Sequence, residues 1–393
     1  MGLGTLAIGT SGYSMTGLLP AMSTHLHITP AVAGQLLTVF AVTCAVAGPI
    51  LTIATRRWDR RRLLTAALAV TAAGNVMAAV VPTVPLLFVA RFVTGLGTAV
   101  YTAGAASMAA QLNKPERRAR AIAVVFGGLT LALLLGVPSV MALSAPLGYQ
   151  GTFWLVAALC AFGGLLIRLV VPRTRSTPRR DGPYRAARIN RHVRGVLVAA
   201  LLASLSSFAV YTYISALLNH ITGAERETIA GLLVGYGIGA AIGNSLGGRA
   251  TDHYGPRRVL LVAIGLCATL LAALPVTATT VPGAAATLVM WGCAFWAVNP
   301  PLSSWLIQRT PQQTDDLLSL LASSIYLGMG IGGLLGGVVV SLFDIGLLPN
   351  VAGILAAVAF VVVARTDQAA TITCPPPCEP GRTTSEIIDS TST

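Results

Sequence analysis

The chain has 393 residues, of which 54% are hydrophobic and only 10% are charged. Soluble globular proteins carry charge at about a quarter of their positions, so this composition excludes a soluble globular protein. The formal net charge of +13 would suggest nucleic acid binding in a soluble protein. The placement of the charges along this chain has a different explanation, and we expect no nucleic acid partner.

Twelve apolar stretches follow one another, each close to the length of about 20 residues that a helix needs to cross a bilayer. The sequence lacks the alternating pattern of outer-membrane barrels, so helices are the spanning structures that remain. We expect an all-α membrane protein with twelve transmembrane helices in the lipid bilayer. They cover residues 2–22, 33–55, 63–81, 84–112, 119–143, 149–171, 194–218, 228–248, 257–277, 282–307, 316–342 and 346–365.

The basic residues are distributed unevenly between the two sides of these spans. Of the 26 Lys and Arg residues, 24 lie in alternate loops or in the tails. The exceptions are Arg226, in a loop on the opposite side, and Arg91, within a span. Basic residues concentrate on the cytoplasmic side of membrane proteins. We therefore expect a multi-pass protein of the cytoplasmic membrane, with both termini in the cytoplasm.

The chain divides into two halves that repeat. Residues 54–64 align with residues 250–260 at an offset of 196, which pairs Arg61 with Arg257 and Arg62 with Arg258. A duplicated six-helix unit around a central basic linker is an arrangement found in secondary transporters. The expected domains are a six-helix half over 1–171, a cytoplasmic linker over 172–193, a second six-helix half over 194–365 and a disordered tail over 366–393.

The six cysteines predict neither a metal site nor a disulfide framework. Four of them stand singly in apolar spans, where cysteine serves as a small packing residue. The other two, Cys374 and Cys378, flank three prolines in the tail and are too few for a structural zinc. We expect no metal and no cofactor.

One loop between two apolar stretches carries the pattern Gly-x-x-x-Asp-x-x-Gly-x-Arg-Arg over residues 248–258. Gly248 would let backbones approach closely, and Asp252 can pair with arginines or with a helix N-terminus. Gly255 allows a sharp turn. Two arginines alone would indicate only an ordinary basic loop. The full pattern between two spans resembles the loop motif of the major facilitator superfamily, a family of secondary transporters with twelve helices.

The resemblance implies a transporter rather than an enzyme, in which the two halves move against each other. It also implies that the residues of this loop motif help to hold the cytoplasmic side of the transporter closed. The gating-loop residues would be Gly248, Asp252, Gly255, Arg257 and Arg258, with Arg61 and Arg62 in the first half.

Shorter motifs make the resemblance more specific. Residues 9–20, G-T-S-G-Y-S-M-T-G-L-L-P, are similar to the start of the twelve-span drug:proton antiporter branch, which includes arabinose, purine and chloramphenicol efflux proteins. The fourth span resembles the superfamily's Arg-containing motif from Arg91 onward, and the fifth resembles a loose antiporter motif. The small or ring-constrained residues of these motifs are expected to shape helix packing. They are Gly95, Gly97, Gly136 and Pro138.

Arg91 is the one charge that these boundaries place well inside a span. Burying it costs about 2.5–3.5 kcal/mol on insertion scales, which makes an ionisable group there a functional candidate. In one interpretation Arg91 faces a central cavity and attracts substrate or responds to a nearby proton. In the other it is a structural arginine bonded to helix carbonyls.

Related sequences of this branch typically carry an acidic residue in the first span, where this chain has Ser11-Gly12. None of the 13 Asp and Glu residues lies in the middle of a span by these boundaries. Protons as the coupling ion therefore follow from the resemblance alone. An uncoupled facilitator or importer of a sugar or nucleoside, and a transport-dead membrane sensor, stay open as alternatives. A membrane enzyme acting on a lipid-linked substrate is disfavoured, because no span carries a metal-ligand cluster, a nucleophile–base pair or paired carboxylates.

By analogy with the superfamily, the first, fourth, seventh and tenth spans line a central cavity, with four others beside them. Their polar and aromatic residues are candidate substrate contacts, and each of them is equally suited to helix packing. As a set they favour a neutral or weakly anionic organic molecule. We expect export of a small organic molecule, such as a drug, sugar or nucleoside, by alternating access, with a monomer sufficient. The candidates are Ser11, Tyr13, Gln35, Arg91, Tyr101, Tyr211, Tyr213, Tyr236, Trp296, Asn299, Ser324 and Tyr326.

Overall fold

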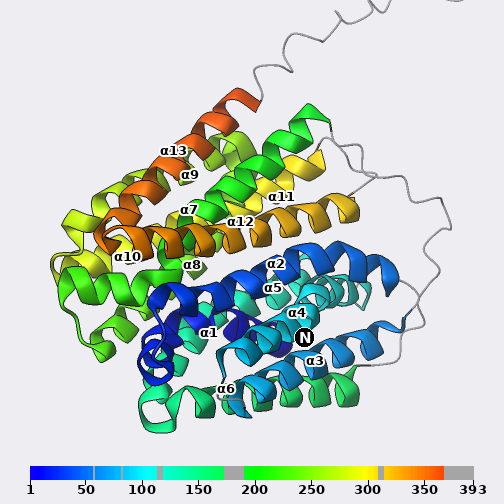
Figure 1. Ribbon diagram of the computed structural model, residues 1–393. Helices are drawn as coiled ribbons and strands as arrows, with labels where there is room; N and C mark the ends of the chain where they lie inside the picture. The colour runs from blue at the N-terminus through cyan, green and yellow to red at the C-terminus, as the bar shows by residue number, and fades with distance from the viewer. Residues whose placement is uncertain (56–57, 81–82, 113–117, 172–189, 309–313, 367–393) are drawn as a thin grey trace, which may run out of the picture.

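The computed structural model describes residues 1–55, 58–80, 83–112, 118–171, 190–308 and 314–366. These residues form long helices and contain no strand (Figure 1). The prediction of an all-α membrane protein is confirmed. The predicted linker and tail lie almost wholly outside the described residues.

The first half of the chain forms a bundle of helices that pack on one another. Its members are α1 (Gly2–Leu26), α2 (Pro30–Ala54), α3 (Arg60–Val80), α4 (Val84–Gln111), α5 (Arg118–Leu131), the π-helical turn η2 (Ala132–Gly136) and α6 (Val137–Val170). The second half forms a second bundle. Its members are α7 (Arg191–Thr222), α8 (Arg226–Tyr254), α9 (Pro256–Thr277), α10 (Val281–Trp296), α11 (Asn299–Gln308), α12 (Thr314–Leu342), the 3-10 turn η4 (Ile345–Leu347) and α13 (Leu348–Thr366).

Polar residues fix several helix starts. The Thr29 hydroxyl accepts a hydrogen bond from the Val32 amide at 3.3 Å, and Pro30 then opens α2. The Asn190 side chain accepts from the Val193 amide at 2.8 Å, so α7 begins at Arg191, three residues before the predicted boundary at 194. Such caps satisfy amides that a helix start leaves without partners.

Two predicted spans contain breaks. The fifth runs through α5, η2 and the first part of α6, and the Val137 amide bonds to the Ala132 carbonyl just before Pro138. A proline has no amide hydrogen, so a widened turn beside it is physically reasonable. The tenth span is divided between α10 and α11, where Pro300 and Pro301 follow.

The helix α6 contains two arms that meet at Gly148, whose φ of 68° is left-handed and suits glycine. Ten stretches of the described residues are long and apolar enough to cross a membrane, and one of them, Val124–Val170, includes both arms of this turn. The 25-residue helix α1 is not among the ten. The structure is thus consistent with twelve spans.

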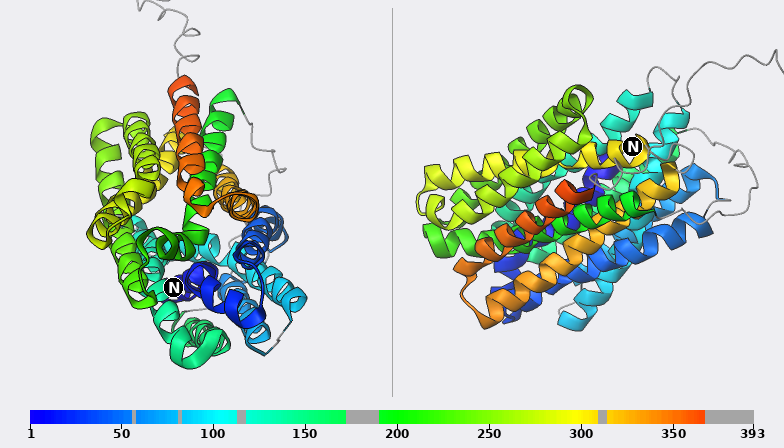
Figure 2. Two further views of the ribbon diagram at one scale, coloured as in Figure 1. Left: turned by 60° about the vertical axis from the view of Figure 1, so that its left-hand side comes forward. Right: turned by 90° about the horizontal axis from the view of Figure 1, so that it is seen from above.

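The two bundles meet along a seam. There α1, α2, α5, η2 and α6 of the first bundle contact α7, α8 and α12 of the second. In Figure 1 α12 lies beside α2 at this seam, and the left view of Figure 2 shows the blue and cyan helices grouped apart from the yellow and orange ones.

The turns between the helices gather at two opposite ends of the molecule. The turns near Gly148, Gly223 and Thr280 lie together, since the Arg226 guanidinium bonds the Ser144 hydroxyl and the Thr222 hydroxyl bonds the Ala278 carbonyl. We call this the Gly223 end. The opposite end holds Met1 and the turn at Gly255, and we call it the Gly255 end.

Candidate functional site

Arg91 lies inside the first bundle. Its side chain is only 1% exposed, and Nη1 donates to the Ser11 carbonyl of α1 at 2.9 Å. The guanidinium carbon lies 4.8 Å from the centre of the Phe153 ring on α6, within cation–π range. Nη2 makes no hydrogen bond with a described residue. Arg91 therefore joins α4 to α1 and α6, and its contacts agree with the interpretation as a structural arginine.

The Ser11 side chain is also engaged within this bundle. The Asn75 amide of α3 donates to the Ser11 hydroxyl at 2.8 Å and to the Thr71 carbonyl at 2.8 Å. Together with Arg91 these residues form a cluster around Ser11, and all four side chains (Ser11, Thr71, Asn75 and Arg91) are buried. The position at which relatives typically carry an acid thus holds a neutral hydrogen-bonded group. Sequence reasoning missed Asn75, although a single amide in the apolar stretch 63–81 was a visible signal.

The aromatic candidates gather elsewhere, at the seam. Tyr13 of α1 stacks on Phe208 of α7, with ring centres 6.3 Å apart and an angle of 8° between the planes. Phe208 in turn lies 6.0 Å from Tyr211 and 5.7 Å from Phe295. Residues two positions apart point about 200° apart around a helix, which is why Tyr13 faces the second bundle while Ser11 faces the first.

Further rings extend this group into the second bundle. Tyr236 of α8 lies 4.8 Å from Tyr211 and 5.1 Å from Trp291 of α10, and Trp296 lies 6.1 Å from Phe295. The indole nitrogens of Trp291 and Trp296 are buried and make no hydrogen bond with a described residue. We call these rings the aromatic cluster. It consists of Tyr13, Phe208, Tyr211, Tyr236, Trp291, Phe295 and Trp296.

The described residues that form the aromatic cluster carry no formal charge, but they retain donors and acceptors. Phe208, Trp291 and Phe295 were not among the sequence candidates, although Trp291 and Phe295 lie in the same predicted span as the candidate Trp296. Its rings have apolar faces and carry hydroxyl and indole groups at their edges.

Two tyrosine candidates lie away from the cluster. The Tyr101 hydroxyl donates to the Met1 carbonyl at 3.0 Å, inside the first bundle near the Gly255 end. The Tyr213 hydroxyl donates to the Gly333 carbonyl of α12 at 3.0 Å, close to α2. Both side chains are fully buried. The structure therefore separates three tyrosine environments that the sequence had grouped together.

The remaining candidates are half-buried. Gln35 of α2 lies against α12, where its amide nitrogen would be 2.5 Å from a Cβ placed at Gly337. Asn299 opens α11, and its carbonyl accepts from the Ser303 hydroxyl at 3.1 Å. Ser324 and Tyr326 lie on α12, where Tyr326 packs against the apolar core.

The gating-loop residues lie at the Gly255 end. Gly255 has a φ of 80°, and its amide closes α8 on the Thr251 carbonyl at 3.0 Å. Asp252 and Arg258 are exposed, and Asp252 forms no ion pair with a described residue. A Cβ at Gly248 would meet nothing within 4 Å. The expected close approach at Gly248 is thus absent in this conformation, and Gly247 makes one instead, where a Cβ would lie 2.7 Å from the Ala297 carbonyl oxygen.

In each of the two repeated loops, one arginine donates a hydrogen bond to a carbonyl of its own bundle. Arg257 donates to the Ala364 carbonyl at 2.8 Å, and Arg61 donates to the Arg168 carbonyl. The neighbouring Arg62 is exposed, and its amide bonds to the Asp59 carboxylate at 3.2 Å.

The expected packing residues lie at close helix contacts. A Cβ at Gly95 would lie 2.8 Å from the Thr43 Cβ, and one at Gly97 would overlap the Thr71 side chain. A Cβ at Gly136 would overlap the Thr10 side chain, and Pro138 is buried beside it. These contacts support the packing role proposed for the four residues.

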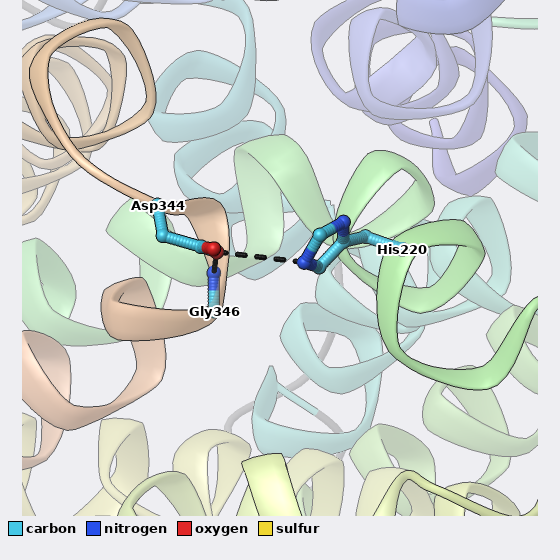
Figure 3. Close-up of polar contacts among 3 residues, drawn as sticks. All are labelled: His220, Asp344 and Gly346. Carbon is cyan, nitrogen blue, oxygen red and sulfur yellow. Dashed lines mark hydrogen bonds and ion pairs between the residues drawn. The ribbon is translucent and has the colours of Figure 1, made fainter.

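An ion pair lies at the Gly223 end, within the second bundle. The His220 ring nitrogen is 3.4 Å from the Asp344 carboxylate, which also accepts from the Gly346 amide at 2.6 Å (Figure 3). Both side chains are more than half exposed. In the part of the chain that the structure describes, no group of three or more His, Cys, Asp or Glu residues is placed to hold a metal ion.

Comparison with solved structures identifies the fold. The nucleoside transporter NupG aligns with a TM-score of 0.71 at 15% identity, covering 93% of this chain and 98% of that chain. The human organic anion transporter MFSD10 aligns with a TM-score of 0.71 at 16% identity, covering 92% and 98%. Identities this low show a shared fold and nothing about substrate.

Sequence relatives are closer. The inner membrane transport protein YdhP of Escherichia coli (strain K12) is 29% identical over 365 residues, which is 92% of this chain and 94% of YdhP. The chloramphenicol resistance protein of Streptomyces lividans is 31% identical over 262 residues, 65% of this chain and 67% of that protein. A model of the Major Facilitator Superfamily matches residues 1–316 and 196–383, which together span nearly the whole chain. The chain belongs to the major facilitator superfamily and is a multi-pass membrane transporter, not an enzyme.

Proposed function

We propose that this transporter exports a small neutral aromatic molecule that binds at the aromatic cluster. The observation that carries the proposal is the position of the cluster, where Tyr13 of one bundle meets Phe208 of the other. In alternating-access carriers the substrate binds between the two halves, so that either side can open to it. A binding surface contributed by both bundles meets that requirement.

The character of the cluster supports a neutral substrate. Its described members are uncharged, whereas the buried Arg91 lies against Phe153 within the first bundle. A cation there would have no carboxylate partner among the described residues, and only cation–π contacts with the rings would offset its lost hydration. Chloramphenicol, a neutral molecule with an aromatic ring and several acceptor atoms, has the chemistry that this surface favours. Relatives named for resistance to it or efflux of it include proteins of Streptomyces lividans and Mycobacterium tuberculosis.

The orientation belongs to the same proposal. Arg61, Arg257 and Arg258 lie at the Gly255 end, and basic residues favour the cytoplasmic side. We therefore assign the Gly255 end and both termini to the cytoplasm. The Gly223 end then faces outward.

The test uses an efflux-deficient bacterial host that expresses this chain, a variant or an empty vector. The native chain should raise the inhibitory concentration of chloramphenicol and leave that of a permanent cation, tetraphenylphosphonium, unchanged. Trp296→Leu should remove most of this protection, because it deletes a ring and an indole donor from the cluster. Trp154→Leu is the matched control, since Trp154 is 49% exposed on α6 and belongs to no cluster. Equal protection by both variants would contradict the proposed site.

A second candidate function is an uncoupled carrier, and a specific observation favours it. Every Asp and Glu in the described part of the chain lies at or near a helix end, and Ser11 is neutral. A proton antiporter needs a titratable group that both sides can reach in turn. Substrate uptake into inverted vesicles, with and without an imposed pH gradient, separates the two candidates. Uptake that accelerates with the gradient supports antiport, and equilibration at the same rate without it supports the uncoupled carrier.

A further inference from the structure

The geometry points to Tyr213 as a lock between the two bundles, one that holds the Gly223 end closed. This inference requires that the protein be a transporter of this family, and it is independent of which substrate it carries. It concerns a residue that the sequence had placed among the substrate contacts.

The Tyr213 ring sits in a socket made by glycines of both bundles. A Cβ at Gly336 of α12 would lie 2.7 Å from the ring carbon Cε2, and one at Gly337 would lie 2.8 Å from the hydroxyl. A Cβ at Gly34 of α2 would overlap the hydroxyl and the ring. The close approach of the ring is possible only because these positions lack side chains.

The Tyr213 hydroxyl makes hydrogen bonds at the end of this socket. Within the second bundle it donates to the Gly333 carbonyl of α12 at 3.0 Å. Its hydrogen bond across the seam is to the Ala31 carbonyl of α2, at 3.5 Å. Tyr213 is 0% exposed, so this polar group has its partner deep in an apolar contact. The bond to Gly333 orients the ring on α12, and the close approach of Gly34 and Ala31 to that ring fixes the position of α2 against α7 and α12.

Other contacts across the seam lie at the same end. The Ser215 hydroxyl donates to the Thr16 carbonyl at 3.1 Å, and Arg226 bonds the Ser144 hydroxyl. A Cβ at Gly237 of α8 would lie 2.5 Å from the Leu134 Cα in η2. Each of these contacts joins one bundle to the other between mid-height and the Gly223 end.

Toward the Gly255 end, fewer contacts join the two bundles. Val42 of α2 contacts Gly330 of α12, but Val46 and Ile53, on the same face of α2, are 57% and 44% exposed. Among the described helices, none of the first bundle packs along α11 or α13. A separate apolar cluster there contains residues of the second bundle alone, such as Leu260, Trp305 and Val363. The structure therefore shows a conformation closed at the Gly223 end.

Alternating access requires the Gly223 end to open, and the Tyr213 ring must then leave its socket. Tyr213→Phe removes only the hydroxyl. The bond to Ala31 is the one that opening breaks, and it is long at 3.5 Å. Loss of a hydrogen bond changes an equilibrium by about two- to tenfold, so we expect a shift of about twofold toward the state open at the Gly223 end. Gly34→Ala fills the socket and should shift the equilibrium in the same direction and further.

Hydrogen–deuterium exchange of the full chain in lipid nanodiscs, with no substrate added, measures this shift. In Tyr213→Phe, peptides from residues 28–38 and 330–342 should exchange faster, and peptides from the Gly255 end of α2 should exchange more slowly. Tyr101→Phe is the matched control, because it removes a tyrosine hydroxyl bonded to a carbonyl within one bundle. Gly127→Ala is the control for Gly34→Ala, because a Cβ at Gly127 would meet nothing within 4 Å.

Unchanged exchange at 28–38 in Tyr213→Phe would overturn the lock, because faster exchange at 330–342 alone would follow from loss of the Gly333 bond within the second bundle. So would the same acceleration in Tyr101→Phe, which would show a general loss of stability. Size-exclusion chromatography checks that each variant is folded, and Tyr213→Phe decides the question if Gly34→Ala fails that check. Failure of chloramphenicol export would leave this result intact, because the measurement needs no substrate.

Discussion

Arg61 and Arg257 make the same hydrogen bond in the two halves of the chain. Each guanidinium donates to a backbone carbonyl 107 residues further along, at Arg168 and at Ala364. Donors and acceptors both match at the offset of 196 that relates the sequence repeats. The duplication therefore extends to a tie between the third and sixth spans of each bundle at the Gly255 end, where the arginine meets the carbonyls of a helix C-terminus.

This relationship predicts that Arg61→Gln and Arg257→Gln each loosen their own bundle. Each variant should lower the thermal midpoint of unfolding by about 1–3 °C, and the double variant should lower it by the sum, because the two sites share no partner. Differential scanning fluorimetry in detergent provides the measurement. Arg258→Gln, at an exposed neighbour, is the control. A double variant no less stable than either single one would refute the independence of the two ties.

The twelve-span pattern could be predicted because the apolar runs are long and their ends are marked by arginines and prolines. Which side of each helix faces the seam could not be predicted from these signals. Tyr101 and Tyr213 are the same residue type in similar apolar surroundings, but Tyr101 bonds Met1 inside the first bundle and Tyr213 lies at the seam against Gly34 of α2. That difference arises from tertiary packing.

The buried cluster around Ser11 shows a second limit. The sequence singled out Ser11 and Arg91, which bond each other directly. It missed Asn75, which donates to the Ser11 hydroxyl from a helix that the superfamily analogy places outside the cavity. The break between α10 and α11 had a visible signal in Pro300 and Pro301. It was missed because apolar residues resume at Trp305, so that the whole stretch 282–307 has about the length of one span.

The Ser11–Asn75 hydrogen bond should contribute modestly to stability. Interhelical hydrogen bonds in membrane proteins average about 0.6 kcal/mol in double-mutant cycles. Ser11→Ala, Asn75→Leu and the double variant should yield a coupling free energy of about that size, measured by unfolding in a denaturant series. A coupling energy indistinguishable from zero would show that the contact contributes nothing.

The His220–Asp344 ion pair should contribute little to stability. Both side chains are more than half exposed, and exposed pairs contribute about 0–1 kcal/mol. His220→Ala should therefore leave the thermal midpoint within about 2 °C of the native value. Asp344→Ala should cost more, because its carboxylate also caps the Gly346 amide (Figure 3). Equal, large losses in both variants would assign the pair a greater role.

Two substitutions at Arg91 can distinguish a role of its positive charge from a role of its planar guanidinium group. Arg91→Lys keeps the positive charge but loses the planar group that faces Phe153 and reaches the Ser11 carbonyl. If Arg91 is structural, Lys and Met variants should show similar losses of thermal stability and of chloramphenicol protection. Full protection by Arg91→Lys beside inactive Arg91→Met would instead show that the charge itself acts in transport. Expression in the membrane fraction is the control for both.

Asp252 should act in the conformation that this structure does not show. It is exposed here and pairs with no described residue, so Asp252→Asn should leave the thermal midpoint unchanged. If its carboxylate latches the Gly255 end when that end closes, the same variant should impair export while inserting normally into the membrane. Combining Asp252→Asn with Tyr213→Phe should restore part of the export, because one change weakens closure at the Gly255 end and the other weakens closure at the Gly223 end. Normal export by Asp252→Asn alone would remove the latch role, and export in the double variant no better than in Asp252→Asn would show that the two ends are not balanced against each other.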